Sequence, residues 1–223
     1  MADMSDATLN INMLVSGSND SCVKVWDVAG WDYEVTVWDG VIRDYAVKMC
    51  DASKGLCLTT LEGHTRAVTC LAMLSDGCLC VSADSTGLVK IWDPIKAVCV
   101  KTLVGHTMSV SSMLVCGNNI ITGSADKTIR VWSVSKKACI ATLTGHKSSV
   151  NCLAILNVDE GDGSAVILVS GSADSTIKIW DIQDKQCVRT LKGSAGSVTS
   201  IVVMESGQRL ATICSDSNLK IWD

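Results

Sequence analysis

Short apolar segments alternate with polar, turn-forming residues along most of the chain. The apolar segments are rich in Val, Ile, Leu and Thr, and Gly, Asp, Ser and Asn separate them. This pattern favours β-strands bounded by turns, and no segment shows the periodicity of an amphipathic helix. The single proline, Pro94, follows a Trp-Asp pair where a turn is expected, so it removes no strand N–H group. We therefore predict an all-β chain.

The strand pattern repeats four times with a period of roughly 40 residues. Each copy opens with a related phrase, at residues 57–64, 99–106, 139–146 and 187–194. Each copy closes on a Trp, at Trp92, Trp132, Trp180 and Trp222. We expect four strands per copy, named d, a, b and c in chain order; in the first copy they lie near 57–61, 68–73, 78–82 and 88–92. Such sheets are stabilised by stacking on one another in a ring, which predicts a β-propeller.

Gly-His followed by Trp-Asp at this distance resembles the WD40 repeat family, over residues 56–223. The resemblance implies a propeller of four-stranded antiparallel blades. It also implies a network in each blade that links the His, a Ser or Thr on strand b, an Asp in the b–c turn and the Trp of strand c. Two copies contain the whole set, namely His106, Thr122, Asp126 and Trp132, and then His146, Ser170, Asp174 and Trp180. Buried indole and imidazole groups need such partners.

Two copies depart from this pattern. Counting back from Trp92 places Thr86 where the Asp is expected, so we predict that the network of His64, Ser82 and Trp92 lacks its carboxylate. The last copy has Ser194 in place of the His, although it retains Thr212, Asp216 and Trp222. Both units are expected to be less stable than the complete ones, and mutation of His146 should destabilise the protein more than mutation of Ser194.

The first fifty residues are irregular. Ser16, Asp20 and Trp26 fit strands b and c, and Cys50 takes the Trp position in a second partial match at 44–51, while the pairs at 31–32 and 38–39 look coincidental. Strands near 13–16, 22–26, 33–38 and 45–50 predict one abnormal four-stranded blade and about five blades in total. The alternative is an incomplete, open ring cut from a larger propeller. We assign residues 1–51 to the irregular N-terminal part and 52–223 to four regular repeats of one propeller domain, with 4–12 as a strand that completes the last blade.

Composition narrows the functional classes. The net charge of -4 gives no basic field for nucleic acid, and no apolar run reaches the length of a membrane span. Residues 1–10 lack the features of a signal peptide. Most of the 12 cysteines recur at equivalent repeat positions, so we interpret them as small buried hydrophobic residues and not as disulfides or metal ligands. Cytoplasmic location is expected, with the nucleus as the alternative.

The candidate chemistry favours binding over catalysis. All three histidines belong to the repeated network, no cofactor motif is present, and the acidic segment 159–162 does not have calcium-loop spacing. We therefore predict a scaffold or adaptor that binds other proteins or peptides within a multiprotein complex. The candidate contact residues lie in the d–a loops of the top rim: Arg66 and Lys147 for an acidic or phosphorylated peptide, and Met108 as an apolar anchor. The alternatives are a substrate-recognition subunit of a ubiquitin ligase and a catalytic or metal-dependent protein.

Overall fold

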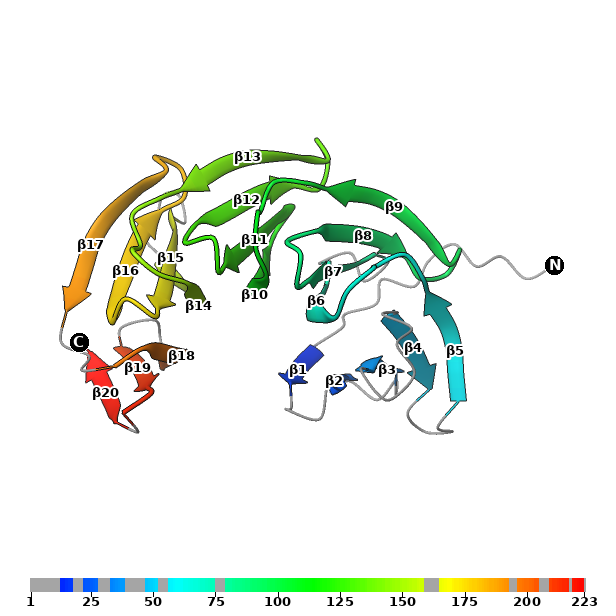
Figure 1. Ribbon diagram of the computed structural model, residues 1–223, viewed down its shortest axis with the longest axis horizontal. Coiled ribbons are helices and arrows are strands. Elements are labelled where there is room, and N and C mark those ends of the chain that lie inside the picture. The colour runs from blue at the N-terminus through cyan, green and yellow to red at the C-terminus, as the bar shows by residue number, and fades with distance from the viewer. Residues whose placement is uncertain are drawn as a thin grey trace.

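The protein is all-β, and its antiparallel strands form five sheets that follow one another along an arc (Figure 1). The computed structural model describes residues 13–17, 22–27, 33–38, 47–51, 56–74, 79–158, 165–192, 196–204, 209–216 and 218–222. The first strand of each regular sheet lies near the centre of the arc and the last lies at its periphery. This arrangement agrees with the predicted propeller blades. In the described residues, no helical segment has the length and hydropathy that a membrane crossing requires.

Three central sheets have four strands each, in the order a, b, c and d. Within each of them, neighbouring strands in the sheet are also neighbours in the sequence, because short polar turns allow each strand to fold back on the one before. Their bounds are β6 (Val68–Met73), β7 (Cys80–Asp84), β8 (Val89–Asp93) and β9 (Val98–Leu103); β10 (Val110–Cys116), β11 (Asn119–Ser124), β12 (Ile129–Ser133) and β13 (Ala138–Leu143); and β14 (Val150–Val158), β15 (Ala165–Ser172), β16 (Thr176–Asp181) and β17 (Gln186–Lys192).

The first sheet has five strands, where the sequence predicted a blade of four. It contains β1 (Met13–Gly17), β2 (Cys22–Asp27), β3 (Tyr33–Trp38), β4 (Val47–Asp51) and β5 (Leu56–Leu61). The fifth strand is the strand d that opens the first regular sequence repeat, and its backbone pairs with β4. A sequence repeat and a sheet are therefore offset by one strand.

The strand register explains why this irregular region still forms one sheet. In the regular sheets, the Ser or Thr of strand b lies opposite a basic residue of strand c, as Thr122 lies opposite Arg130. The first sheet has this register twice, because Ser16 is opposite Lys24 and Thr36 is opposite Lys48. It therefore combines two strand pairs of the b–c type. Asp20, the pair at 31–32 and the strand predicted at 4–12 lie outside the described residues.

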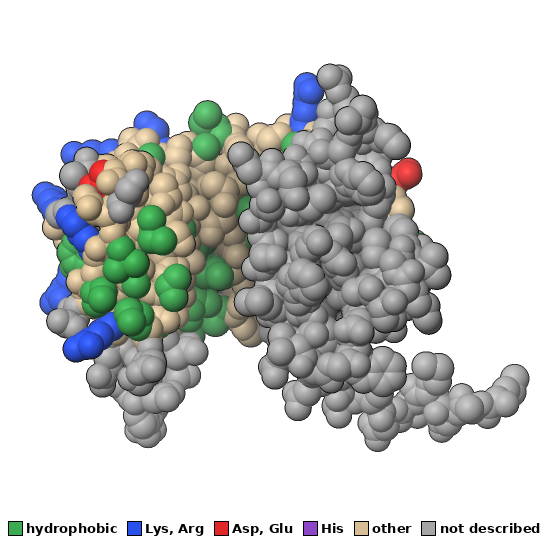
Figure 2. Space-filling view, turned by 90° about the horizontal axis from the view of Figure 1, so that it is seen from below, with side chains coloured by type: hydrophobic (Ala, Val, Ile, Leu, Met, Phe, Trp, Pro, Cys, Tyr) green, Lys and Arg blue, Asp and Glu red, His purple; other side chains and the backbone are tan. Residues whose placement is uncertain are grey.

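The last sheet has three described strands, β18 (Val198–Met204), β19 (Arg209–Cys214) and β20 (Leu219–Trp222). One of its faces carries exposed apolar side chains, which Figure 2 shows gathered on this part of the molecule. The exposed fractions are 57% for Val202, 46% for Ile213, 62% for Leu219 and 56% for Ile221. In the described part of the chain, no later sheet covers this face.

Neighbouring regular sheets pack closely through valines of strand a. A Cβ placed on Gly123 would lie 2.7 Å from Val150 Cγ1, and one on Gly171 would lie 2.5 Å from Val198 Cγ1. Glycine is needed at both positions because the following sheet approaches the backbone directly. The Val side chains, with the apolar residues of strands b and c, form the buried cores between sheets.

The cysteines with described side chains range from buried to exposed, which partly corrects the prediction that those at repeated positions are buried. Cys70 and Cys80 lie in the core, and burial raises the pKa of each thiol to about 12. Cys99 and Cys187, however, are exposed. They lie on strand d, which is the outer strand of its sheet and therefore has no neighbour on that side. All cysteines with described side chains are free thiols.

Candidate functional site

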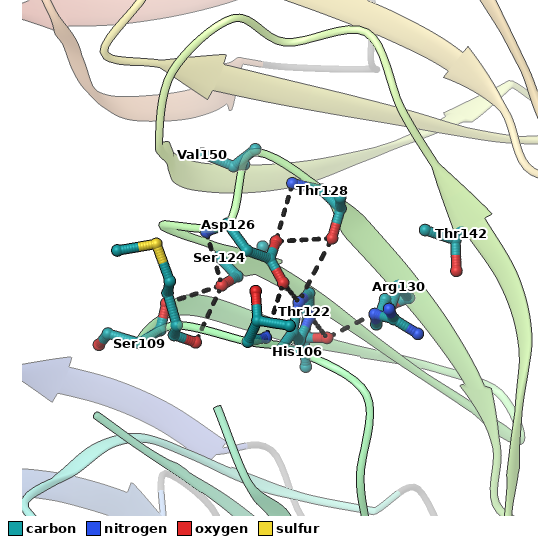
Figure 3. A network of polar contacts seen from close by, with 12 residues as sticks. His106, Ser109, Thr122, Ser124, Asp126, Thr128, Arg130, Thr142 and Val150 are labelled. Carbon is teal, nitrogen blue, oxygen red and sulfur yellow. Dashed lines mark hydrogen bonds and ion pairs between the residues drawn. The ribbon is translucent and has the colours of Figure 1, made fainter. Parts of the chain in front are cut away.

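The sheet β10–β13 brings the four predicted network residues together, and Figure 3 shows three of them, His106, Thr122 and Asp126. His106 Nδ1 lies 2.7 Å from Asp126 Oδ2, and His106 Nε2 lies 2.8 Å from Thr122 Oγ1. Trp132 Nε1 donates to the same hydroxyl oxygen at 2.8 Å. The network thus joins the loop that precedes strand a to strands b and c of one sheet.

A neutral imidazole satisfies this chain of contacts. The indole N–H donates to the Thr122 hydroxyl, the hydroxyl donates to His106 Nε2, and Nδ1–H donates to Asp126. The imidazole carries no charge in this arrangement. Burial lowers the pKa of His106 below its ordinary value of 6.5, although Asp126 acts in the opposite direction. A neutral, fully occupied His is suited to structural support and is unavailable for acid–base chemistry.

The sheet β14–β17 repeats this geometry. His146 Nδ1 lies 2.9 Å from Asp174 Oδ2, and Nε2 lies 2.7 Å from Ser170 Oγ. Trp180 Nε1 donates to Ser170 Oγ at 2.7 Å. Serine and threonine are interchangeable here because the network uses only the hydroxyl.

The sheet β6–β9 corrects the prediction of an incomplete network. His64 Nδ1 lies 2.7 Å from Asp84 Oδ2, and Nε2 lies 2.6 Å from Ser82 Oγ, to which Trp92 also donates at 2.7 Å. The carboxylate is therefore present, two positions earlier than in the other sheets. Counting residues from Trp92 found Thr86 because it assumed that the turn is identical in every repeat.

A shared local motif explains how Asp84 replaces the expected residue. Thr86 donates both its N–H, at 2.9 Å, and its hydroxyl, at 2.5 Å, to Asp84 Oδ1. Thr128 makes the same two contacts with Asp126 Oδ1, at 2.9 and 2.6 Å. An Asp-x-Thr sequence thus fixes the carboxylate in each case, and it is the signal in the sequence that locates the acid.

The last sheet retains part of the network. Trp222 Nε1 donates to Thr212 Oγ1 at 2.9 Å, as in the other sheets. Asp216 accepts hydrogen bonds from the backbone and side chain of Asn218, at 3.2 and 2.8 Å. Ser194, which replaces the histidine, lies outside the described residues.

The network carboxylates also hold the rim loops. Asp126 Oδ2 accepts the N–H of Thr107 at 3.1 Å, and Asp174 Oδ2 accepts the N–H of Lys147 at 2.7 Å. Burial alone would raise the pKa of Asp126, but hydrogen bonds from Thr128 and His106 outweigh it and bring the pKa to about 2. The carboxylates stay ionised, so they hold these loops at any neutral pH.

The three predicted contact residues project from the d–a loops, and a network carboxylate holds the loops of Met108 and Lys147. Arg66 and Lys147 are exposed, and Met108 is 54% exposed. Arg66 and Met108 occupy equivalent loop positions, whereas Lys147 lies one position earlier, directly after the network His. The Met108 carbonyl is 3.1 Å from Ser124 Oγ, so the backbone is fixed while the side chain faces outwards. The loops therefore present separate side chains on rigid supports.

Among the described residues, no group of three or more His, Cys, Asp or Glu side chains is placed to hold a metal ion. The acidic segment 159–162 lies outside the described residues.

Comparison with known proteins agrees with the geometry. The profile of the family described as WD domain, G-beta repeat, matches residues 6–27, 55–93, 97–133, 137–181 and 185–223. The first match ends at the strand pair β1–β2, and residues 28–54 are not matched. A search of the curated proteins found no match.

Proposed function

Because the matched segments cover most of its length, this chain belongs to the WD40 repeat family, and we propose that it is a scaffold whose rim loops bind partner proteins or peptides. Members of the family are generally protein-interaction scaffolds. The proposed contact residues are Arg66, Met108 and Lys147. We also propose that residues 1–51 and 52–223 act as one propeller domain.

One observation carries this proposal: the buried network fixes the backbone of loops whose side chains are exposed. His106 is 6% exposed, whereas Met108, two residues later, is 54% exposed. A side chain on a rigid backbone loses little entropy on binding, which favours affinity. Arginine and methionine are also enriched at the centres of protein interfaces.

The hydrogen bonds of the network histidines disfavour catalysis. His64, His106 and His146 each have both ring nitrogens occupied by partners within their own sheet. The family is typically non-catalytic, and we propose no catalytic role and no cofactor for this chain.

Affinity purification followed by mass spectrometry tests the proposal. We expect the variant with Arg66→Ala and Lys147→Ala to lose partners that the unmodified chain retains. The matched control carries Lys101→Ala and Lys136→Ala, which remove the same charge from exposed positions on strand d and in the c–d turn. An identical partner list for all three proteins would refute the rim assignment.

A further inference from the structure

The outer part of the sheet β14–β17 contains a pocket of about 400 Å³ lined by three lysines. Lys147 comes from the rim loop, Lys178 from strand c and Lys192 from the end of strand d. In the strand ladder, Thr176 lies opposite Lys192 and Lys178 lies opposite Thr190, so these four side chains share one face. The pocket therefore combines three ammonium groups with two hydroxyl groups.

Neighbouring acids neutralise only part of the charge of the lysine ammonium groups. In the part of the chain that the structure describes, the ion pairs are formed by other residues. Asp174 is the one acidic residue of the lining, and its oxygens already accept hydrogen bonds from His146, Lys147 N–H and Thr176. The lining thus has an excess of two positive charges.

One lysine is held in place while two are free to adapt. Lys178 Nζ donates to Thr190 Oγ1 at 2.8 Å and lies 6.0 Å from the centre of the Trp180 ring. A Cβ on Gly145 would be 3.8 Å from Lys178 Cε, so the side chain lies directly beneath the rim loop. Lys147 and Lys192 are exposed at the opening.

The other regular sheets show that two of these lysines are not needed for the fold. The sheet β10–β13 has Thr107, Arg130 and Thr144 at the three positions, and the sheet β6–β9 has Thr65, Lys90 and Val104. Each of those sheets keeps one cation, stacked 5.9 or 5.8 Å from the Trp ring of its strand c. Lys147 and Lys192 are therefore additions that are specific to this sheet.

We propose that this pocket binds the phosphate of a phosphoserine or phosphothreonine in a partner peptide. A phosphate ester carries a charge close to −2 at pH 7 and three acceptor oxygens, which matches the excess charge and the donors of the lining. A carboxylate would match only part of this charge and only some of these donors. The proposal rests on the proposed function, because the pocket opens beside Lys147 of the rim.

The test uses the full chain and peptide arrays with degenerate flanks and a central phosphothreonine, threonine or glutamate. We expect retention of the phosphothreonine array alone. Lys147→Thr and Lys192→Thr, which copy the residues of the sheet β10–β13, should each weaken retention about tenfold. Lys185→Gln, in the turn at the other end of β16 and β17, is the control and should have no effect. Equal retention of the three arrays, or no effect of the two Thr variants, would overturn the proposal.

Introducing the two additional lysines into the sheet β10–β13 provides the converse test. Thr107→Lys combined with Thr144→Lys recreates the three cations around Arg130, so a second phosphopeptide should bind per chain. Vesicles with phosphatidylinositol phosphate and a single-stranded RNA serve as other probes: lysine-dependent binding to either, without phosphopeptide binding, contradicts the proposal. Phosphatase treatment of the lysate separates the two proposals. If it leaves the partner list unchanged, and the variant with Arg66→Ala and Lys147→Ala still loses partners, the phosphate site is refuted. The scaffold function stands in that case.

Discussion

The sheets β10–β13 and β18–β20 present equivalent apolar faces, but in the described structure only the first is covered by another sheet. Ile129 and Val131 are 0% exposed, whereas the equivalent Leu219 and Ile221 are 62% and 56% exposed. The strands have the same register in both sheets. Burial at these positions is therefore a property of the neighbouring sheet and not of the strand itself.

The difference between the covered and the exposed sheet face is visible in the sequence at one position. The residue after the network Ser or Thr is Ala83, Gly123 or Gly171 in the covered sheets and Ile213 in the last one. Small residues are required where the next sheet's valine touches the backbone. A valine cannot approach Ile213 as Val150 approaches Gly123. The last face is thus built differently from the interfaces between regular sheets.

The largest contrast is expected from truncation of equivalent side chains. Ile129→Ala should lower the free energy of unfolding by about 3 kcal/mol, because it leaves a cavity between two sheets. Leu219→Ala should change it by less than about 1 kcal/mol, because that side chain is already mostly in water. Urea unfolding of both variants measures the difference. Equal losses would mean that the last face is covered in solution.

The next contrast compares Asp84, the carboxylate that lies two positions earlier than in the other sheets, with the neighbouring Thr86. Asp84→Ala and Asp126→Ala should each destabilise the protein by about 3 kcal/mol, since each leaves a buried His without its acceptor. Thr86→Ala should have a smaller effect, because Thr86 only supports the carboxylate. The comparison uses thermal and urea midpoints. A greater loss for Thr86→Ala than for Asp84→Ala would contradict the network in the sheet β6–β9.

A smaller contrast is expected between the complete and the substituted networks. His146→Ala should cost about 2 kcal/mol, because Ser170 and Asp174 lose their shared partner. Ser194→Ala should shift the unfolding midpoint less, since the last repeat has no histidine at this position. Similar midpoint shifts for the two variants would argue against the assigned network.

The smallest effect is the pH dependence of the networks. Burial lowers the pKa values of His64, His106 and His146, so the unfolded chain binds protons more readily than the folded chain. Stability should therefore fall as the pH drops through 6.5. A further loss is expected below 3.8, because the pKa of Asp126 is about 2 in the folded state.

Urea unfolding between pH 7.5 and 4.5 measures the histidine contribution. His106→Gln is the control, since it removes one titrating group and should make the dependence shallower. Stability that is flat or increases on acidification in this range would show that the histidines are protonated in the folded protein.

Local patterns in the sequence determined the strands, the repeat and most of the site. Alternating apolar residues and polar turns are local signals, and the two complete networks are what the resemblance to the WD40 repeat implies for residues at the matching positions. The Asp-x-Thr motif, also local, marks Asp84, but counting from Trp92 overlooked it. The fifth strand of the first sheet was missed because a sequence repeat begins with a strand that belongs to the preceding sheet.

Only the tertiary structure decided which faces and side chains are covered. Cys99 and Cys187 recur as regularly as core residues do, yet they are exposed because strand d is the outer strand. The lysine pocket likewise joins residues 147, 178 and 192, which are distant in sequence. The hydrogen bonds within a blade join residues whose spacing is set by the strands and turns of one repeat. Burial and pocket formation depend instead on which other segments the fold places next to a residue.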